Sequence, residues 1–98
     1  MARLIWTQKA LDDLERLIEY ISVDAPVAAR RLAQQIIRRV EVLQRSPESG
    51  GWMQEDDRRV YREILHGNYR IIYRVEARDV YIVAIHHAAR LFSSDELD

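Results

Sequence analysis

The stretch HGNYRIIYRV, residues 66–75, decides the fold of this chain, because it reads as a turn followed by a strand. Gly67 and Asn68 both tolerate positive φ, which a two-residue β-hairpin link requires. The segments on either side, residues 60–65 and 69–75, have the composition of β-strands. The sequence therefore predicts an antiparallel hairpin formed by these two segments.

A two-residue link also sets the register of this hairpin. Leu65 faces Arg70 and Glu63 faces Ile72, so Glu63 lies diagonal to both Arg70 and Arg74. In one interpretation these arginines form exposed ion pairs with Glu63, each worth ~0–1 kcal/mol. In the other interpretation they line a functional surface of the protein.

Residues 80–86 form a third β-type run. Its segment VYIVAI is apolar on both sides, which suits a strand that is covered on both faces. If the preceding link has an even length, His86 joins the face opposite to Arg70 and His87 joins the Arg70 face. An odd link or a β-bulge would exchange the two histidines.

The first half of the chain predicts a short strand followed by two helices. Residues 3–6 are mostly apolar, and Thr7 suits a helix N-cap. Asp24 is expected to cap the second helix, with Pro26 in its first turn and Pro47 just beyond its end. Apolar residues recur at three- and four-residue spacing along both helices: Ala10, Leu11, Leu14, Leu17, Ile18 and Ile21, then Ala29, Leu32, Ala33, Ile36, Ile37, Val40 and Leu43.

Together these elements predict an α+β fold with the order β-α-α-β-β-β. Only a few residues separate the helices, so they should form an antiparallel hairpin that covers one face of a small, mainly antiparallel sheet. The opposite face is expected to be partly open and to carry Arg70, Arg74, Tyr81 and, with an even link, His87. Residues 1–98 are expected to form a single domain.

Composition excludes several classes of protein. There is no cysteine, so disulfides, thiolate catalysis and cysteine-based metal sites are excluded, as is typical of a reducing compartment. No apolar run approaches about 18 residues and the N-terminus lacks a signal-peptide pattern, so no membrane contact and a cytoplasmic location are expected. The formal charge is −1, yet residues 58–90 carry seven arginines against three acids. Arginine favours planar, bidentate contacts at interfaces.

Strong catalytic motifs are absent from the sequence. There is neither a phosphate-binding glycine loop nor an HExxH pair, and no cofactor is expected. His86 and His87 are adjacent in a predicted strand and should point to opposite faces, so no metal site is expected either. Arg70, Arg74 and Arg90, with His87, are the candidates for binding phosphates or assisting phosphodiester cleavage.

The chain resembles the RelE/ParE superfamily of bacterial type II toxin–antitoxin toxins. WTQKALDDLERLIEYI is similar to the strand end and first helix of that family, and LQRSPESGG to the end of its second helix and the following loop. VYREILHGNYRIIYRVEARDVYIVAIHHAAR is similar to its C-terminal sheet. GNYRIIYRV is the most specific part, and it implies a RelE/ParE-like fold with this arginine on an exposed concave face.

The superfamily divides by function: RelE-like members cleave mRNA on the ribosome, whereas ParE-like members poison DNA gyrase. The resemblance places Arg70 and Arg90 at two RelE catalytic positions. The RelE lysine pair falls on a segment that offers Arg62 and no lysine, and residues 91–98 lack the RelE tyrosine. The resemblance therefore favours a ParE-like toxin. As a nuclease, the chain would depend on Arg70, Arg90, His87 and His86; as a poison, it would contact its target through Arg62, Arg70, Arg74, His87 and Arg90.

The resemblance also implies partners. A cognate antitoxin should neutralise the chain with a tail that folds on binding. DNA gyrase is the expected target, with the ribosome and mRNA as the alternative, and operator DNA is expected to be reached only through the antitoxin. A third possibility is a toxin fold that has lost its target and retains only antitoxin binding.

Overall fold

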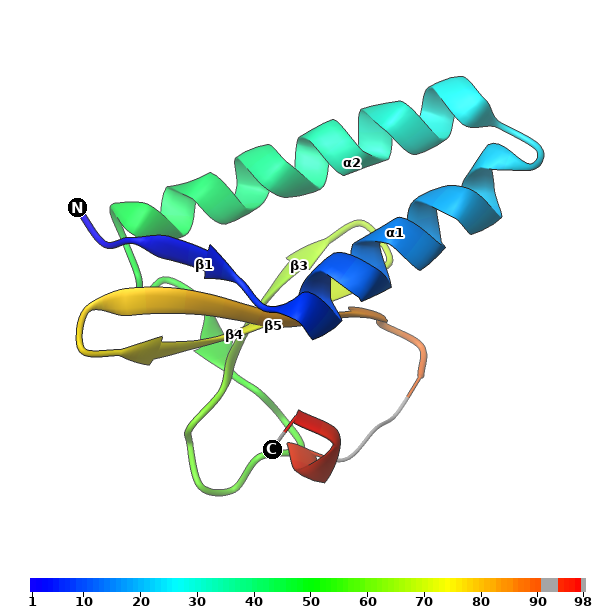
Figure 1. The fold of residues 1–98 in the computed structure, drawn as a ribbon. Coiled ribbons are helices and arrows are strands. Elements are labelled where there is room, and N and C mark those ends of the chain that lie inside the picture. Colours follow the sequence, from blue (N-terminus) through cyan, green and yellow to red (C-terminus); the bar gives the residue numbers. More distant parts are fainter. Residues whose placement is uncertain (91–93, 98) are drawn as a thin grey trace.

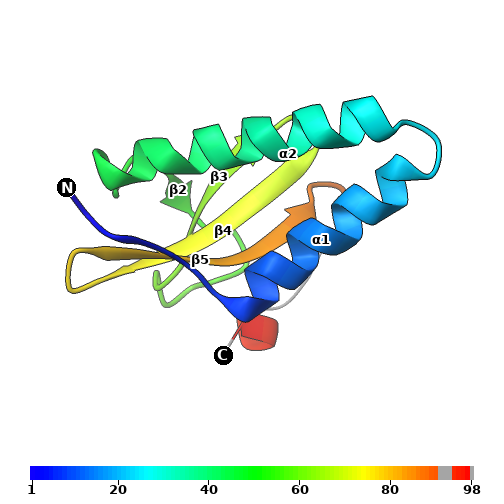
Figure 2. The same ribbon diagram turned by 45° about the horizontal axis from the view of Figure 1, so that its top comes forward.

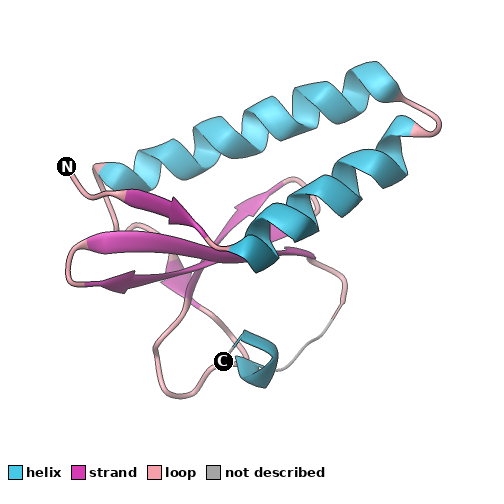
Figure 3. Cartoon of the chain, viewed as in Figure 1, coloured by secondary structure: helices cyan, strands magenta, loops and turns pink. Residues whose placement is uncertain are grey.

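The computed structural model describes residues 1–90 and 94–97, and it has two helices packed on one sheet (Figures 1 and 3). The strands run in the spatial order β1-β5-β4-β3-β2, and every pairing is antiparallel except the parallel pair β1–β5. This confirms the predicted fold class and adds a short strand and two 3₁₀ turns. The elements are β1 Leu4–Trp6, α1 Gln8–Ser22, α2 Pro26–Glu41, η1 Val42–Gln44, β2 Gly51–Trp52, β3 Arg62–His66, β4 Tyr69–Glu76, β5 Asp79–His87 and η2 Ser94–Leu97.

The start of α1 is fixed to the sheet by Thr7. Its hydroxyl accepts a hydrogen bond from the Ala10 amide at 3.2 Å and donates one to the Ile82 carbonyl at 2.9 Å, which confirms the predicted cap. The predicted cap of α2 is wrong. Ala25 occupies the N-cap position and makes no side-chain hydrogen bond, because α2 begins one residue later than an Asp24 cap requires. In the described part of the chain, no helix is long and apolar enough to span a bilayer.

The main core lies between the helical hairpin and the sheet. Ile36, Val40 and Leu43 are fully buried there against strand residues such as Tyr73. Parts of the predicted stripes are wrong, since Leu11 and Ile37 are both over two-fifths exposed. Figure 2 shows the reason: the two helices cover the sheet as a single layer, and no other element of the described residues packs on their outer side. Leu14 packs against this core but is only half-buried.

The hairpin between β3 and β4 has the predicted register. Leu65 pairs with Arg70 and Glu63 pairs with Ile72. Gly67 in the link has a φ of 57°, the left-handed region that glycine adopts without strain. Arg70, Ile72 and Arg74 therefore share the face of the sheet that points away from the helices.

The last strand departs from the predicted facing. Ala77 and Arg78 form an even, two-residue link, but Val83 is an extra residue between the pairs Ile72–Ala84 and Tyr73–Ile82. This β-bulge exchanges the sides of everything after it. His86 consequently lies opposite Arg70, and His87 lies opposite Tyr69 on the helix side, which corrects the prediction for an even link.

The face away from the helices is less open than predicted, because the loop from residue 53 to 61 covers part of it. Met53 and Tyr61 pack on Ile72 in a second small core. Asp56 holds the loop closed: its buried carboxylate accepts hydrogen bonds from the backbone amides of residues 58, 60 and 61. Burial alone would raise the pKa of Asp56, but hydrogen bonds, first that from the Tyr61 amide, outweigh it and the pKa lies below its usual value.

Candidate functional site

Arg70 lies near the start of β4, the middle strand, on the sheet face that points away from the helices, and it contacts two carboxylates. Its Nη2 lies 2.5 Å from Glu55 Oε1 and 2.8 Å from Glu63 Oε2, and its Nη1 donates to Glu55 at 2.7 Å. The Arg70 side chain is 6% exposed, and the side chains of Glu55 and Glu63 are each 18% exposed. We call these three residues the Arg70 cluster.

The predicted ion pair between Glu63 and Arg70 is confirmed, but its predicted exposure is wrong. Arg70 is buried because the loop that carries Glu55 folds back over it. Hydrogen bonds, first that to Glu55, raise the pKa of Arg70 despite its burial, so its charge is permanent. With one cation and two anions, the cluster has no net positive charge to offer a phosphate.

The two neighbouring arginines stack on aromatic rings. The guanidinium carbon of Arg74 lies 4.3 Å from the ring centre of Tyr81, and that of Arg62 lies 3.9 Å from the ring centre of Trp52. Arg62 also donates to the Gly50 carbonyl at 2.8 Å. Both side chains remain accessible to a partner, but they are already engaged within the chain.

A groove with several cations lies elsewhere, where the end of β5 approaches α1. Two adjoining hollows of about 350 and 490 Å³ share Arg16, His87 and Arg90 in their walls. Lys9 lines the first hollow, and Tyr20 lines the second. We call this region the β5-end groove. It brings together the predicted residues Arg90 and His87 with two cations from α1.

Sequence reasoning missed the two cations from α1. Lys9 and Arg16 are seven residues apart, which places them on the same side of a helix. Asp13 lies between them, 3.0 Å from the Lys9 ammonium and 4.0 Å from the Arg16 guanidinium. Its carboxylate also accepts the Ile85 amide of β5 at 3.0 Å, which anchors α1 beside the bulge. The seven-residue spacing of Lys9 and Arg16 is the sequence pattern that could have predicted this pair of cations.

The two predicted histidines do not act together. The ring nitrogen Nε2 of His86 lies 3.2 Å from the Arg90 carbonyl, on the Arg70 side of the sheet. Burial, followed by the charge of Arg90, lowers the pKa of His86, so this ring is neutral at pH 7. His87 stacks edge-on against Tyr69 with ring centres 5.6 Å apart, and its Nδ1 accepts the Ala89 amide at 3.1 Å. The two side chains leave opposite faces of β5, although both line the first hollow of the β5-end groove.

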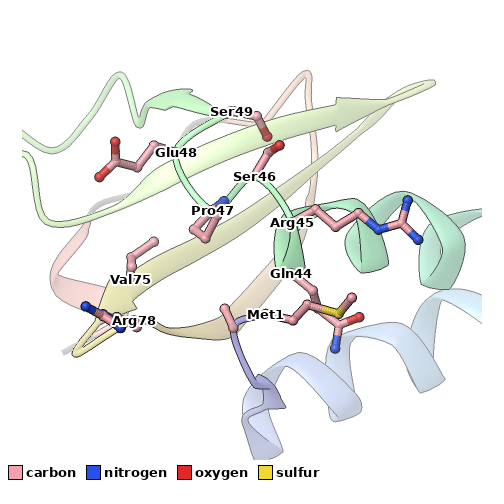
Figure 4. A pocket seen from close by; sticks show the side chains of 10 residues that line it. Met1, Gln44, Arg45, Ser46, Pro47, Glu48, Ser49, Val75 and Arg78 are labelled. Carbon is pink, nitrogen blue, oxygen red and sulfur yellow. The ribbon is translucent and has the colours of Figure 1, made fainter.

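A further hollow has none of the predicted site residues in its walls. It has a volume of about 810 Å³ and lies between the N-terminus, residues 44–49 and the β4–β5 link (Figure 4). Val75 and Arg78 form its sheet side, at the far end of β5 from Arg90. Among residues 1–90 and 94–97, no group of three His, Cys, Asp or Glu residues is placed to hold a metal.

Comparison with known proteins gives the family. Residues 4–92 match the family described as the ParE toxin of the parDE type II toxin–antitoxin system. The chain belongs to the ParE toxin family. It is also similar to the protein named Toxin RelE2 of Caulobacter vibrioides, with 36% identity over 91 residues that span 93% of this chain and all of that protein.

Two solved structures share the fold of this ParE-family chain. One is the chromosomal ParDE toxin–antitoxin system of P. aeruginosa, with 25% identity, a TM-score of 0.78, and coverage of 89% of this chain and 96% of that one. The other is the RelBE2 toxin–antitoxin complex of Mycobacterium tuberculosis, with 21% identity, a TM-score of 0.65, and coverage of 88% and 96%. The chain is therefore a type II toxin of the RelE/ParE superfamily. The RelE-type tyrosine position falls in residues 91–98, of which 91–93 and 98 lie outside the described residues.

Proposed function

We propose that this toxin acts by binding DNA gyrase and that it does not cleave RNA. The observation that carries the proposal is the Arg70 cluster. A RelE-type nuclease needs a free cation beside the scissile phosphate, and here the corresponding arginine is held by Glu55 and Glu63. If Arg70 left the cluster to bind a phosphate, Glu55 and Glu63 would remain beside that phosphate, and their negative charges would repel it.

The lack of a proton-transfer pair supports the same proposal. RNA cleavage by this route requires one group to accept the 2′-hydroxyl proton and another to protonate the leaving oxygen. His86 and His87 are adjacent in β5, so their side chains leave opposite faces of the strand. Each ring is also already engaged with the backbone: Nε2 of His86 lies 3.2 Å from the Arg90 carbonyl, and Nδ1 of His87 accepts the Ala89 amide.

The binding surface that we assign to the target is the β5-end groove. Arg90 is exposed there, and Arg16 and Lys9 add positive charge on the α1 side. Arg74 is not part of this groove, because it lies opposite Tyr81 near the start of β5. Such a surface acts through contacts, so each substitution should weaken the toxin gradually and not abolish a chemical step.

Parallel assays of DNA supercoiling by gyrase and of mRNA cleavage on ribosomes test this proposal with the purified chain. We expect loss of supercoiling, no cleaved RNA, and a several-fold weaker effect in the Arg90→Ala variant. Arg78→Ala, an exposed arginine at the opposite end of β5, is the matched control and should act like the wild type. Codon-specific RNA cleavage that disappears in Arg90→Ala or His87→Ala would overturn the proposal.

A nuclease is the second candidate, because a relative that is 36% identical is named Toxin RelE2. The same two assays decide between the candidates. A chain that affects neither supercoiling nor translation, yet binds its antitoxin, would be a toxin fold that has lost its target.

We further propose a cognate antitoxin, in the cytoplasm, as the natural partner. Both solved relatives are toxin–antitoxin complexes. Two surfaces suit a tail that folds on binding: the part of the β5-end groove beside Leu17 and Tyr20, and the edge of β3 beyond Glu63, which β2 does not cover. Co-expression with the product of the adjacent small gene should yield a complex, which Tyr20→Glu should weaken. Failure to co-purify would refute this partner and leave the gyrase assay unaffected.

A further inference from the structure

The outer side of the helical hairpin carries opposite charges on its two helices. α1 has four acidic and two basic residues, and Asp12, Glu15 and Glu19 follow one another along its outer side. The segment of α2 and η1 through residue 45 has five arginines and one acid, and Arg31 and Arg38 lie two turns apart on its outer side. The two helices lie next to each other in one layer (Figure 2), so the two stripes adjoin.

Asp12 accepts a hydrogen bond from the Gln8 side-chain amide at 2.9 Å, but within residues 1–90 and 94–97 no cation forms an ion pair with the acidic stripe. The ion pairs of α1 join Asp13 to Lys9 and Arg16, on the side that faces β5. Among the described residues, no ion pair links α1 to α2, and the exposed arginines Arg31 and Arg38 have no carboxylate partner. An acidic stripe beside a basic one disfavours a uniformly charged ligand such as a nucleic-acid backbone, because α1 would repel the phosphates.

We propose that this face binds the same face of a second copy of the chain, with α1 of each copy over α2 of the other. The complementary surface must carry a basic stripe beside an acidic stripe, and the chain itself has one. A two-fold axis parallel to the helices and between the two hairpins creates this arrangement. An axis perpendicular to the helices would place α1 over α1 and bring like charges together.

The two-fold axis also sets which residues meet. A rotation about an axis along the helices leaves every residue at its own height. Because Ser22 ends α1 and Pro26 begins α2, residues of the two helices whose numbers add up to about 48 lie at the same height. Asp12 of one copy is then level with the turn before Arg38 of the other. Glu19 is level with the turn before Arg31.

The exposed apolar residues of the hairpin fit the same arrangement. Leu11 and Ile37 have numbers that add up to 48, and they are 44% and 42% exposed. The two-fold axis therefore brings one Leu11 and one Ile37 from each copy to a single level, where they can pack together. The β5-end groove lies on the other side of α1 and stays accessible in the dimer, so this proposal does not depend on the target or the antitoxin.

Charge reversal tests the proposal, with the full chain made by cell-free synthesis to avoid toxicity. One variant is reversed on α1 (Asp12→Lys and Glu19→Lys), and the other on α2 (Arg31→Glu and Arg38→Glu). Each variant alone has like charges on both helices and should dimerise at least about tenfold more weakly than the wild type, a loss of about 1.4 kcal/mol. An equal mixture of the two variants should dimerise again, because unlike charges then meet at both contacts.

Analytical ultracentrifugation over a range of concentration and salt gives the readout, and the wild-type dimer should weaken as salt rises. Thermal melting checks that the variants fold, since the changed residues lie on the outer side of the hairpin. Arg59→Glu with Arg78→Glu makes the same charge change away from this face and should leave dimerisation unchanged.

Several results would overturn the proposal. They are a wild-type chain that stays monomeric at high concentration in low salt, reversed variants that dimerise as well as the wild type, and a mixture that stays monomeric. A monomeric chain whose Arg31 and Arg38 region is protected from hydrogen exchange only by the antitoxin would assign the face to the antitoxin instead.

Discussion

Replacing Arg70 by alanine should strongly destabilise the protein. The side chain is 6% exposed, and its loss leaves Glu55 and Glu63, each 18% exposed, facing each other without a cation. Removing one partner of a buried ion pair costs roughly 3–5 kcal/mol, because the remaining charge is desolvated and unpaired. For a domain of this size, that loss lowers the melting temperature by on the order of 12 °C or more.

Urea and thermal denaturation measure this effect, and the chain provides its own control. Arg74 lies on the same strand and face, but its ion pair with the 63% exposed side chain of Glu76 is 3.4 Å long. Arg74→Ala should therefore cost about 1 kcal/mol or less. In a triple variant that also carries Glu55→Gln and Glu63→Gln, Arg70→Met should recover most of the lost stability, because no buried charge is left unpaired.

One result would refute the reasoning. If Arg70→Ala melts within about 2 °C of the wild type, well under 1 kcal/mol for a domain of this size, the cluster is open in solution and Arg70 is free to meet a ligand. If the prediction holds, loss of toxicity in Arg70→Ala reports unfolding and carries no information about the target. Arg90→Ala, which changes an exposed residue, is then the informative substitution.

Two further predictions concern the core and the loop. Ile36→Ala should cost roughly 2–5 kcal/mol in urea denaturation, whereas Ile37→Ala, at a 42% exposed neighbour, should cost well under half of that; equal costs would mean that α2 is wrongly phased. The lowered pKa of Asp56 stabilises the fold above the unfolded-state pKa of about 4, and this stability is lost as pH falls through the lower folded-state pKa. Asp56→Asn should therefore be less stable than the wild type at pH 7, and the gap should close below about pH 4; a gap that is the same at pH 7 and pH 3 would contradict this.

The sequence by itself determined the order of the elements, the two amphipathic helices and the register of the β3–β4 hairpin. These features depend on local chemistry: Gly67 and Asn68 define a short link, Thr7 caps a helix, and apolar periodicity marks the buried sides. The sequence also marked Arg90 as a candidate, since it lies in the segment that resembles the superfamily, and its role stays a prediction. Such features involve residues within a few positions of each other, so a single sequence is enough to predict them.

Only the tertiary structure decided what the candidate residues face. The bulge at Val83 has no signature in the sequence, yet it moves His87 to the helix side and His86 to the Arg70 side. Glu55 reaches Arg70 because a loop fifteen residues away folds back over the sheet, which a local pattern does not encode. A sequence does not distinguish an arginine that is available to a partner from one that is held by carboxylates of its own chain. The difference lies in which carboxylate the fold brings within hydrogen-bond distance, and that distance decides whether the charge is available to a partner.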